Sequence, residues 1–281
     1  MSSHSPSSIS ARRQAFKALH ASGCFVIPNP WDVGSARYLQ GLGFKALATT
    51  SSGYAWSRGR PDGGASRDEV LAHLRDMAAA TDLPVNADFE SGYAPDAQGV
   101  HESVRLAVET GVAGISIEDA SGDAAQPIRP LEDSLARLKA ARSAIDEAGG
   151  EVLLVGRAEN FLYGIDDLAG TIERLKAYAD AGADCVYAPM LPDLAAVRRI
   201  CGAVRVPVNV LAAGPMLGLS RADLAAAGAA RISLGSGLAR VGHAAVLAAA
   251  RAALEGDFRP LAGGASGAEV DALLAKGAGR R

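Results

Sequence analysis

Two carboxylates, Asp88 and Glu90, stand one residue apart in the stretch "VNADFESGY" (residues 85–93), at the end of an apolar run. If that run is a β-strand, residues i and i+2 point to the same side of it, and each carboxylate raises the free-energy cost of ionising the other. Either the strand ends before Glu90 and both side chains face water, or a positive group lies between them. The choice depends on which other charges the fold brings to this place.

The elements that would position these residues follow a regular pattern. Short apolar runs rich in β-forming residues occur at 24–30, 44–50, 83–89, 114–119, 151–157, 185–190, 207–212 and 231–236. Segments with helical periodicity separate them, and a spacing of roughly 20–40 residues is typical of βα units with parallel strands rather than of hairpins. The pattern predicts an α/β fold, a (β/α)8 TIM barrel, with a doubly wound open sheet as the alternative.

The predicted organisation is a single barrel domain over residues 1–281. The barrel covers 20–255, an amphipathic helix at about 8–21 precedes the first strand, and the Gly-rich tail 256–281 holds one short helix near "GAEVDALLAKG". No domain linker is visible before residue 256.

Composition excludes several classes of function. The chain has 28 basic and 31 acidic residues and no basic block, so a nucleic acid is not expected as a partner. The three cysteines are odd in number and widely spaced, which favours free thiols in a reducing compartment. The N-terminus is polar, and no run of about 18 apolar residues is present. These features predict a cytoplasmic protein with no membrane partner.

In a barrel of this kind the active site forms at the C-terminal ends of the strands. Those ends are rich in carboxylates, and four of them could meet at one rim: Asp62, Asp88, Glu90 and Glu118. Four carboxylates do not stay ionised together in a partly buried cleft without a cation. Hard oxygen ligands without nearby His or Cys favour Mg²⁺, or Mn²⁺, over zinc.

Simpler roles compete for each residue taken alone. An acidic residue after a strand is usually a helix cap or a solvated loop charge, and Asp119 and Asp62 fit that role best because each precedes a polar turn. Pairing with Arg157 is the simple alternative for Glu159. The functional interpretation rests on the joint pattern of carboxylates at successive strand ends. Arg240, which follows the eighth run, is a further candidate for substrate binding.

Five stretches carry a family resemblance: "TTSSGYAWSRGRPDG", "ADFESGY", "ISIED", "VGRAENF" and "PVNVLA". In this order and spacing they make residues 20–255 resemble the isocitrate lyase/phosphoenolpyruvate mutase superfamily. The resemblance implies a Mg²⁺-dependent barrel enzyme that breaks or rearranges C–C or P–C bonds in small 2-oxo or 2-hydroxy carboxylates. It also implies a homotetramer, a dimer of dimers whose eighth helix is exchanged between subunits.

The resemblance also implies roles for single residues. Asp88 would be the direct metal ligand, and Glu90, Glu118 and Asp62 would hold metal-bound waters. Substrate would be bound by the residues Ser51, Ser52, Gly53, Arg157 and Asn209, with Arg157 on its second anionic end. Asp62 and Arg157 are the candidate catalytic residues.

Two departures from the superfamily pattern narrow the function. The isocitrate and methylisocitrate lyases carry K-[KR]-C-G-H after the fourth strand, whereas "DASGDAAQPIRPLED" (119–133) has no Cys, Lys or His. Near the end of the sixth strand the lyases have Glu and the phosphonate enzymes His, but this chain has Pro189 or Met190. The first departure disfavours isocitrate and methylisocitrate cleavage, and the second leaves both the lyase set and the phosphonate set of residues incomplete.

The favoured hypothesis is a lyase or decarboxylase that cleaves a C–C bond in a small 2-oxo dicarboxylate, such as oxaloacetate, through a metal-stabilised enolate. Loss of CO₂ needs an electron sink but no acid at the leaving group, which suits the missing Cys. The alternatives are phosphonopyruvate chemistry, as mutase or hydrolase, and a non-catalytic protein that binds 2-oxo acids.

Overall fold

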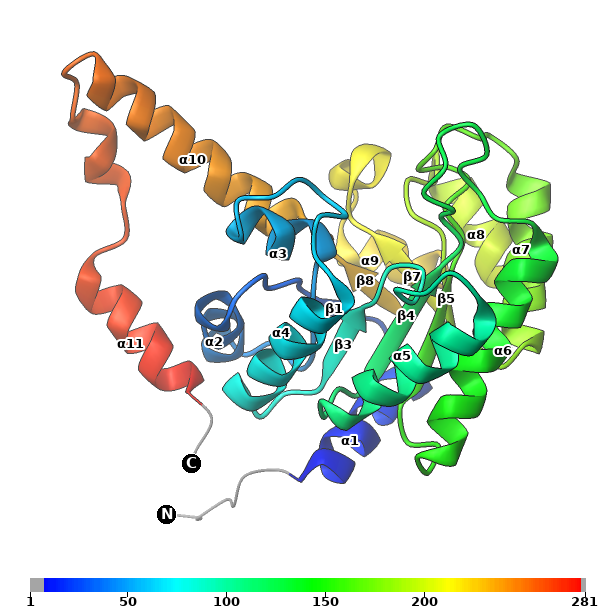
Figure 1. The fold of residues 1–281 in the computed structure, drawn as a ribbon. Coiled ribbons are helices and arrows are strands. Elements are labelled where there is room, and N and C mark those ends of the chain that lie inside the picture. Colours follow the sequence, from blue (N-terminus) through cyan, green and yellow to red (C-terminus); the bar gives the residue numbers. More distant parts are fainter. Residues whose placement is uncertain (1–7, 279–281) are drawn as a thin grey trace.

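The chain forms eight strands that alternate with helices, as Figure 1 shows for the computed structural model, which describes residues 8–278. Residues 1–7 of the polar N-terminal segment and 279–281 of the tail lie outside the described part. The strands are β1 (Phe25–Ile27), β2 (Leu47–Ala48), β3 (Val85–Asp88), β4 (Gly114–Glu118), β5 (Leu153–Arg157), β6 (Cys185–Tyr187), β7 (Val208–Leu211) and β8 (Arg231–Ser233).

The α-helices lie before, between and after these strands. They are α1 (Ile9–Ala21), α2 (Val33–Leu42), α3 (Ser51–Ser57), α4 (Arg67–Ala80), α5 (Ala97–Glu109), α6 (Leu131–Glu147), α7 (Leu168–Asp180), α8 (Leu194–Ala203), α9 (Arg221–Ala226), α10 (Gly237–Leu254) and α11 (Gly267–Gly277). Two 3₁₀ helices, η1 (Gly214–Gly218) and η2 (Arg259–Gly263), complete the set.

The sheet closes on itself. Neighbouring strands pair in parallel in the order β1-β8-β7-β6-β5-β4-β3-β2, so the last strand lies beside the first. The two ends of that order are joined by a hydrogen bond from the Ala48 N–H to the Pro28 carbonyl, 3.0 Å long. The predicted (β/α)8 barrel is confirmed, and the open doubly wound sheet is excluded because β1 pairs with β8.

Local sequence signals explain where the helices begin. Aspartate side chains accept the first free backbone N–H groups of α2, α5, α7 and α8, and serines do so for α1, α4, α9 and α11. Such N-caps each contribute about 1 kcal/mol, which helps to hold short helices of marginal intrinsic stability. These aspartates are therefore occupied, which separates them from the carboxylates at the strand ends.

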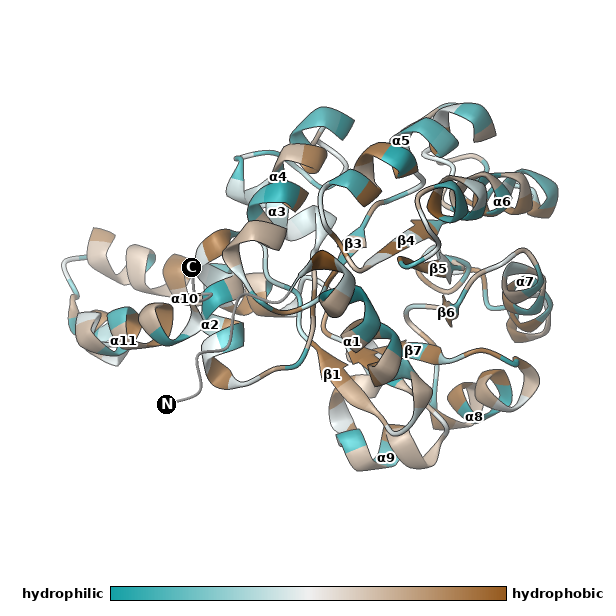
Figure 2. Cartoon of the chain, turned by 90° about the horizontal axis from the view of Figure 1, so that it is seen from below, coloured by the Kyte–Doolittle hydropathy of each residue, from teal (hydrophilic) through white to brown (hydrophobic). Residues whose placement is uncertain are grey.

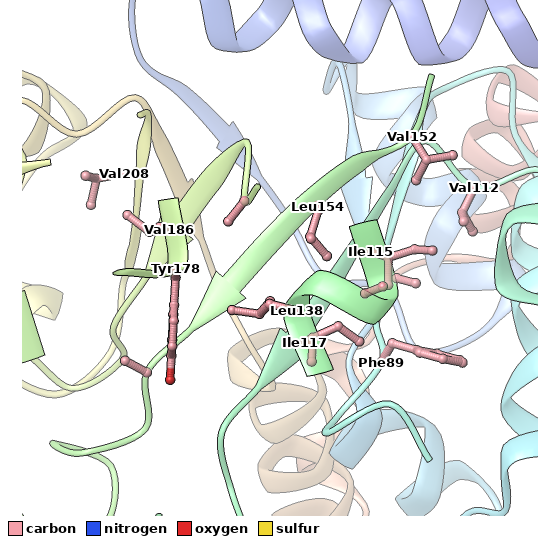
Figure 3. Close-up of a cluster of buried hydrophobic side chains, with 14 of the residues drawn as sticks. Phe89, Val112, Ile115, Ile117, Leu138, Val152, Leu154, Tyr178, Val186 and Val208 are labelled. Atoms are coloured by element: carbon pink, nitrogen blue, oxygen red, sulfur yellow. The ribbon is translucent and has the colours of Figure 1, made fainter. Parts of the chain in front are cut away.

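The main hydrophobic core lies between the strands and the surrounding helices. Figure 3 shows Ile115 and Ile117 of β4 and Leu154 of β5 pointing toward Leu138 of α6, with Tyr178 of α7 beside them. These side chains are at most 2% exposed, and burying each contributes about 1.5–3 kcal/mol before the entropy cost. Because alternate residues face outward into this core, the other half of each strand faces the barrel interior.

The N-terminal end of the barrel is covered by α1, as the view from below in Figure 2 shows. Phe16 of α1 is fully buried there against a small cluster that includes Ile27, Ala46 and Leu153. The predicted helix at 8–21 is thus confirmed, and it closes the N-terminal end of the barrel. The two cavities described below open at the opposite, C-terminal end.

The helix α10 projects away from the barrel, and the chain then returns so that α11 lies against α2 (Figure 1). A Cβ on Gly41 of α2 would come within 2.8 Å of the Leu273 carbonyl oxygen of α11, so this contact is a close backbone approach. By contrast, the apolar side chains of α10 are largely solvent-exposed: Val241, Val246 and Leu254 are 68%, 66% and 85% exposed. Among the residues described, no helix is both long and apolar enough to cross a membrane.

Candidate active site

Two adjoining cavities open at the C-terminal end of the barrel. The inner one, of about 200 Å³, reaches down between the strands, and the outer one, of about 480 Å³, lies among the loops. They share the residues Ser51, Asp62, Arg157 and Leu162. The strand-end carboxylates predicted to meet at one rim all line one or both of these cavities.

Asp88, the last residue of β3, is held by the start of α3. Its Oδ2 accepts hydrogen bonds from the backbone N–H and the hydroxyl of Ser51, each 2.9 Å long. Its own N–H donates to the Thr49 hydroxyl across the neighbouring strand. These three bonds fix Asp88 at the mouth of the inner cavity.

Glu90 leaves the strand in a left-handed turn. Its φ is 46°, and Gly92 at φ 90° and Tyr93 at φ 52° continue the turn. A non-glycine residue in this region costs about 1 kcal/mol or more, and such strain is typical of functional sites. The Tyr93 hydroxyl donates to Glu90 Oε1 over 2.7 Å, which aims the carboxylate into the outer cavity. Gly92 is required by packing as well, because a Cβ there would lie 2.9 Å from Val100.

The positive group beside Asp88 is the guanidinium of Arg157, at the end of β5. Its Nη1 lies 3.1 Å from Glu118 Oε2 and 3.4 Å from Asp88 Oδ1. Its Nε and Nη2 donate to the two carboxylate oxygens of Glu159. The face of the guanidinium lies over the Tyr187 ring, 5.3 Å from the ring centre. Three carboxylates therefore take up the hydrogen-bonding edge of this one arginine.

The pairing of Glu159 with Arg157 is the simple alternative named above, and it is confirmed. The helix-cap interpretation of Asp119 is wrong. Asp119 is 1% exposed and accepts hydrogen bonds from the Tyr178 hydroxyl and the Glu159 N–H, while Arg174 lies 3.3 Å away. It thus fixes the backbone beneath Glu159, and through Glu159 the position of Arg157.

Asp62 lies on the loop between α3 and α4. It is solvent-exposed, accepts a hydrogen bond from the Gly63 N–H and lines both cavities. The cap of α4 is Ser66, so the helix-cap interpretation of Asp62 is wrong and Asp62 is a loop carboxylate. Desolvation by nearby protein atoms and the negative charge of Asp88 raise the pKa of its carboxyl. This effect of Asp88 indicates that the loop brings Asp62 toward the other carboxylates.

The rim carries an excess of negative charge. Burial raises the pKa of Glu118 well above 4.5, and Glu159, Asp88 and Glu90 add to that shift while Arg157 opposes it. Burial likewise raises the pKa of Glu90, with Asp88 and Asp62 contributing and the Tyr93 hydroxyl opposing. Burial alone would lower the pKa of Arg157, but Glu159 and Glu118 outweigh it and raise that pKa. One guanidinium does not balance five carboxylates, so the rim favours a further cation.

The chemistry of these donors fits Mg²⁺, since the rim offers hard carboxylate oxygens, and no Cys, His or Lys of the described residues lines either cavity. Within residues 8–278, however, no three Asp, Glu, His or Cys side chains are gathered closely enough to form a metal site. The guanidinium of Arg157 instead contacts both Asp88 and Glu118. A metal would therefore take over contacts that Arg157 makes in this arrangement.

The residues expected to bind substrate are brought only partly together. Ser51 and Ser52 line the inner cavity, but the Ser51 hydroxyl donates to Asp88, and the Gly53 N–H faces Thr50 Oγ1 as part of the helix cap. Asn209 is fully buried and lines the same cavity. Arg240 does not reach it: it lies on α10, in a separate pocket with Trp56 and His243.

Several residues of the inner cavity were not predicted from the sequence. Three of them carry polar groups used below: Tyr187 at the end of β6, which lies under Arg157, Arg231 at the start of β8, and Asn86 within β3. All three face the barrel interior, because each lies an even number of residues from an inward-facing neighbour on its own strand. Applying the two-residue period to whole strands would have found them.

The positions that depart from the superfamily pattern also line the cavities. Pro189 borders the inner cavity, and Ser121 and Gly122 of the loop after β4 border the outer one. Ala120 pairs with Ile128 across that loop. These positions therefore supply no acid or base to the cleft.

A family model described as phosphoenolpyruvate phosphomutase matches residues 16–254. The chain belongs to this family. It is thereby a member of the isocitrate lyase/phosphoenolpyruvate mutase superfamily of lyases and mutases, and the predicted resemblance is confirmed.

Relatives extend this assignment over nearly the whole chain. A candidate lyase/mutase from Burkholderia cenocepacia J2315 has a solved structure with 44% identity and a TM-score of 0.90, over 94% of this chain and 95% of that one. Oxaloacetate decarboxylase from Rhodopseudomonas palustris BisB18 is 30% identical over 87% of this chain and 83% of its own length. A phosphonopyruvate hydrolase solved with oxalate and Mg²⁺ is 25% identical, with a TM-score of 0.82 over 94% and 95% of the two chains.

Proposed function

We propose that this family member is a Mg²⁺-dependent lyase or decarboxylase that cleaves a C–C bond of a small 2-oxo, or 2-hydroxy, carboxylate. In a 2-oxo acid this is the bond between the carbon next to the carbonyl and the group that leaves, so that an enolate remains. The observation that carries the proposal is the group of carboxylates around Arg157 at the mouth of the inner cavity. The likeness to oxaloacetate decarboxylase supports a C–C substrate, and the hydrolase solved with oxalate and Mg²⁺ supports the metal and the kind of acid.

In this proposal Asp88 would hold the metal, and Glu90, Glu118 and Asp62 would hold it through water. Bound Mg²⁺ would polarise the 2-oxo group and stabilise negative charge that develops on its oxygen. Ser51 keeps the Asp88 carboxylate in place with two hydrogen bonds. Arg157 offsets the charge of the carboxylates and, through Glu159 and Asp119, is anchored to the barrel wall.

The cavity walls suit decarboxylation better than cleavage of a tertiary alcohol. No Cys, His or Lys of the described residues lines either cavity, so no group of these types could take a proton from a 2-hydroxy substrate. CO₂ can leave a 2-oxo dicarboxylate without such a group. Leu162, Pro189 and Leu211 give the inner cavity an apolar side that limits access of water.

The direct test is the purified protein with Mg²⁺ and a panel of 2-oxo acids that includes oxaloacetate and phosphonopyruvate. We expect CO₂ or pyruvate to form from a 2-oxo dicarboxylate and the reaction to stop with EDTA. No turnover of any acid, with EDTA making no difference, would contradict the proposal. Oxo-acid binding without turnover would instead indicate a non-catalytic binding protein.

Phosphonopyruvate chemistry is the second candidate. Asp62 favours it, because its exposed carboxyl lines both cavities and lies on a loop, where it could take part in a transfer. Release of phosphate from phosphonopyruvate, or its conversion to phosphoenolpyruvate, would support phosphonopyruvate chemistry over C–C cleavage.

We further propose that a second copy of the chain covers α10, as part of a homo-oligomer built from dimers. The exposed Val241, Val246 and Leu254 support this, since a helix this apolar is unfavourable in water. Light scattering should give a dimer or tetramer for the wild type and a smaller species for Val246→Asp. Leu217→Asp, at an equally exposed apolar residue of η1, is the control. A monomeric wild type would contradict the proposal.

A further inference from the structure

The inner cavity continues below the carboxylate rim to a second arginine, Arg231. This residue begins β8, is 3% exposed and lines the same cavity of about 200 Å³ as Ser51, Asp88 and Arg157. Buried charged side chains are normally paired with an opposite charge, because removing an ion from water costs several kcal/mol. The partners of Arg231 are therefore informative.

Arg231 has only neutral partners. Its Nε donates to Asn209 Oδ1 over 2.8 Å, and its Nη1 lies 3.5 Å from His20 Nε2. Burial, and next the charge of Arg231, lower the pKa of His20 to about 4, so the ring is neutral at pH 7. Across residues 8–278 no Asp or Glu oxygen lies within 4.0 Å of the Arg231 guanidinium. Its charge is therefore available to a ligand.

Asn86 provides a second, independent sign of a missing ligand. It lines the same cavity and is 2% exposed, yet its side-chain Oδ1 has no hydrogen-bond partner in the described part of the chain. A buried polar atom left without a partner costs about 1–3 kcal/mol. The deep end of the cavity thus holds both a cation without a counter-ion and an acceptor without a donor.

The barrel geometry places Arg231 well below Arg157. The registers pair Glu118 with Arg157, Arg157 with Tyr187, Tyr187 with Asn209 and Asn209 with Arg231. This row starts at the last residue of β4 and ends at the first residue of β8, so it descends from the rim toward the floor. With strands about 4.8 Å apart and tilted by about 36°, the three steps from Arg157 to Arg231 amount to about 8 Å along the barrel axis.

A dianionic ligand would be oriented by this distribution of charge. When a metal takes over Asp88 and Glu118, Arg157 still donates to both carboxylate oxygens of Glu159, and Glu90 and Asp62 add further negative charge at the rim. The free positive charge lies below. A guanidinium binds a carboxylate through paired, charge-assisted hydrogen bonds.

We infer that Arg231 is a specificity-determining residue that binds the second carboxylate of a 2-oxo dicarboxylate reaching into the barrel. The inference rests on the proposed function, because the rim must hold the 2-oxo acid end. It adds an anion-binding group below Arg157 in the same cavity. Asn209 holds the Arg231 guanidinium in place, and Asn86 Oδ1 accepts a hydrogen bond from water around the anion.

Calorimetry with Mg²⁺ present tests this with three probes. Oxalate occupies only the rim, 2-oxoglutarate adds a distal carboxylate, and 2-oxopentanoate has the same chain length without that charge. We expect the wild type to bind 2-oxoglutarate at least about 10-fold more tightly than 2-oxopentanoate. Arg231→Met should remove this preference and leave oxalate affinity within about twofold, whereas Arg231→Lys should keep part of the preference.

The outcomes separate the two proposals. Failure of oxalate to bind the wild type overturns the proposed function. Oxalate binding with no preference for the dicarboxylate, or with a preference that Arg231→Met retains, overturns the role of Arg231 alone. The exposed Arg199→Met on α8 is the matched control and should behave as the wild type. Unchanged oxalate binding also shows that the Arg231→Met protein is folded.

Discussion

Two arginines face the interior of the same barrel and have opposite surroundings. Arg157 at the rim contacts Glu118, Glu159 and Asp88, whereas Arg231 at the floor contacts Asn209 and His20 and no carboxylate within the described residues. The rim has too much negative charge and the floor too much positive charge. A folded chain gains nothing by keeping these charges apart, so the separation favours a metal cation at the rim and an anionic group of a ligand at the floor.

The rim and the floor of the cavity suit different roles. The rim carboxylates have raised pKa values because burial and mutual repulsion disfavour their ionised forms. A divalent cation relieves that repulsion, so the rim is suited to a metal and to the 2-oxo acid end of the substrate. The floor lies about 8 Å deeper by the strand geometry and is suited to recognition.

The largest expected effect comes from removing the carboxylate at the centre of the rim. Asp88→Asn should lower turnover of the 2-oxo acid by more than about 100-fold, because loss of even an outer-shell group at a metal site costs about 10–100-fold. Steady-state assays over a Mg²⁺ titration would measure it. Asp68→Asn, at a side chain 80% exposed on α4, is the control. Equal activity of the Asp88→Asn protein would show that the rim is not the catalytic site.

The second prediction applies one substitution to the rim arginine. Arg157→Met should destabilise the metal-free protein by about 3–5 kcal/mol, because it leaves buried carboxylates without their partner. Mg²⁺ should restore more stability to this variant than to the wild type. Urea unfolding with EDTA and with Mg²⁺ would measure both effects. A Mg²⁺ effect no larger than that of the wild type would mean that metal and guanidinium do not neutralise the same carboxylates.

The third prediction concerns pH. Because the pKa of Glu118 is raised in the folded state, the folded chain binds more protons than the unfolded chain above about pH 4.5, and stability from this group falls as pH rises. The slope for one proton is at most about 1.4 kcal/mol per pH unit. In EDTA, the difference in unfolding free energy between Glu118→Gln and the wild type should therefore grow from pH 5 to pH 8. Glu173→Gln, at an exposed glutamate of α7, should show no such growth. A pH-independent difference would refute the raised pKa.

Much of the fold and of the rim could be predicted from the sequence, for a physical reason. Short β-rich runs and the helical periodicity between them are local signals, and they located all eight strands. The rule that parallel strands present their C-terminal ends at one face then brought Asp88, Glu118 and Arg157 together. No contact between distant residues had to be known for these inferences.

The roles of Asp119, Arg240 and Arg231 could not be predicted, because they depend on contacts between distant parts of the chain that local sequence signals do not encode. Asp119 looked like a cap, but its partners Tyr178 and Arg174 come from α7, far along the chain. Arg240 follows a strand, yet α10 carries it away from the cleft. Arg231 was overlooked because it begins a strand, where barrels rarely place catalytic groups. Whether its guanidinium has a counter-ion is a property of the folded interior only.

The smallest expected effect sharpens the comparison most. Arg231→Met, the same substitution as at Arg157, should change the free energy of unfolding by no more than about 1 kcal/mol, since replacing a buried ion with an apolar side chain of similar volume relieves its desolvation cost. The loss of the hydrogen bond to Asn209 offsets part of that gain. Urea unfolding of both methionine variants side by side in EDTA would measure the contrast. A destabilisation at Arg231 as large as that at Arg157 would mean that Arg231 serves to hold β7 and β8 together, because a residue kept for its ligand adds little to the stability of the ligand-free barrel.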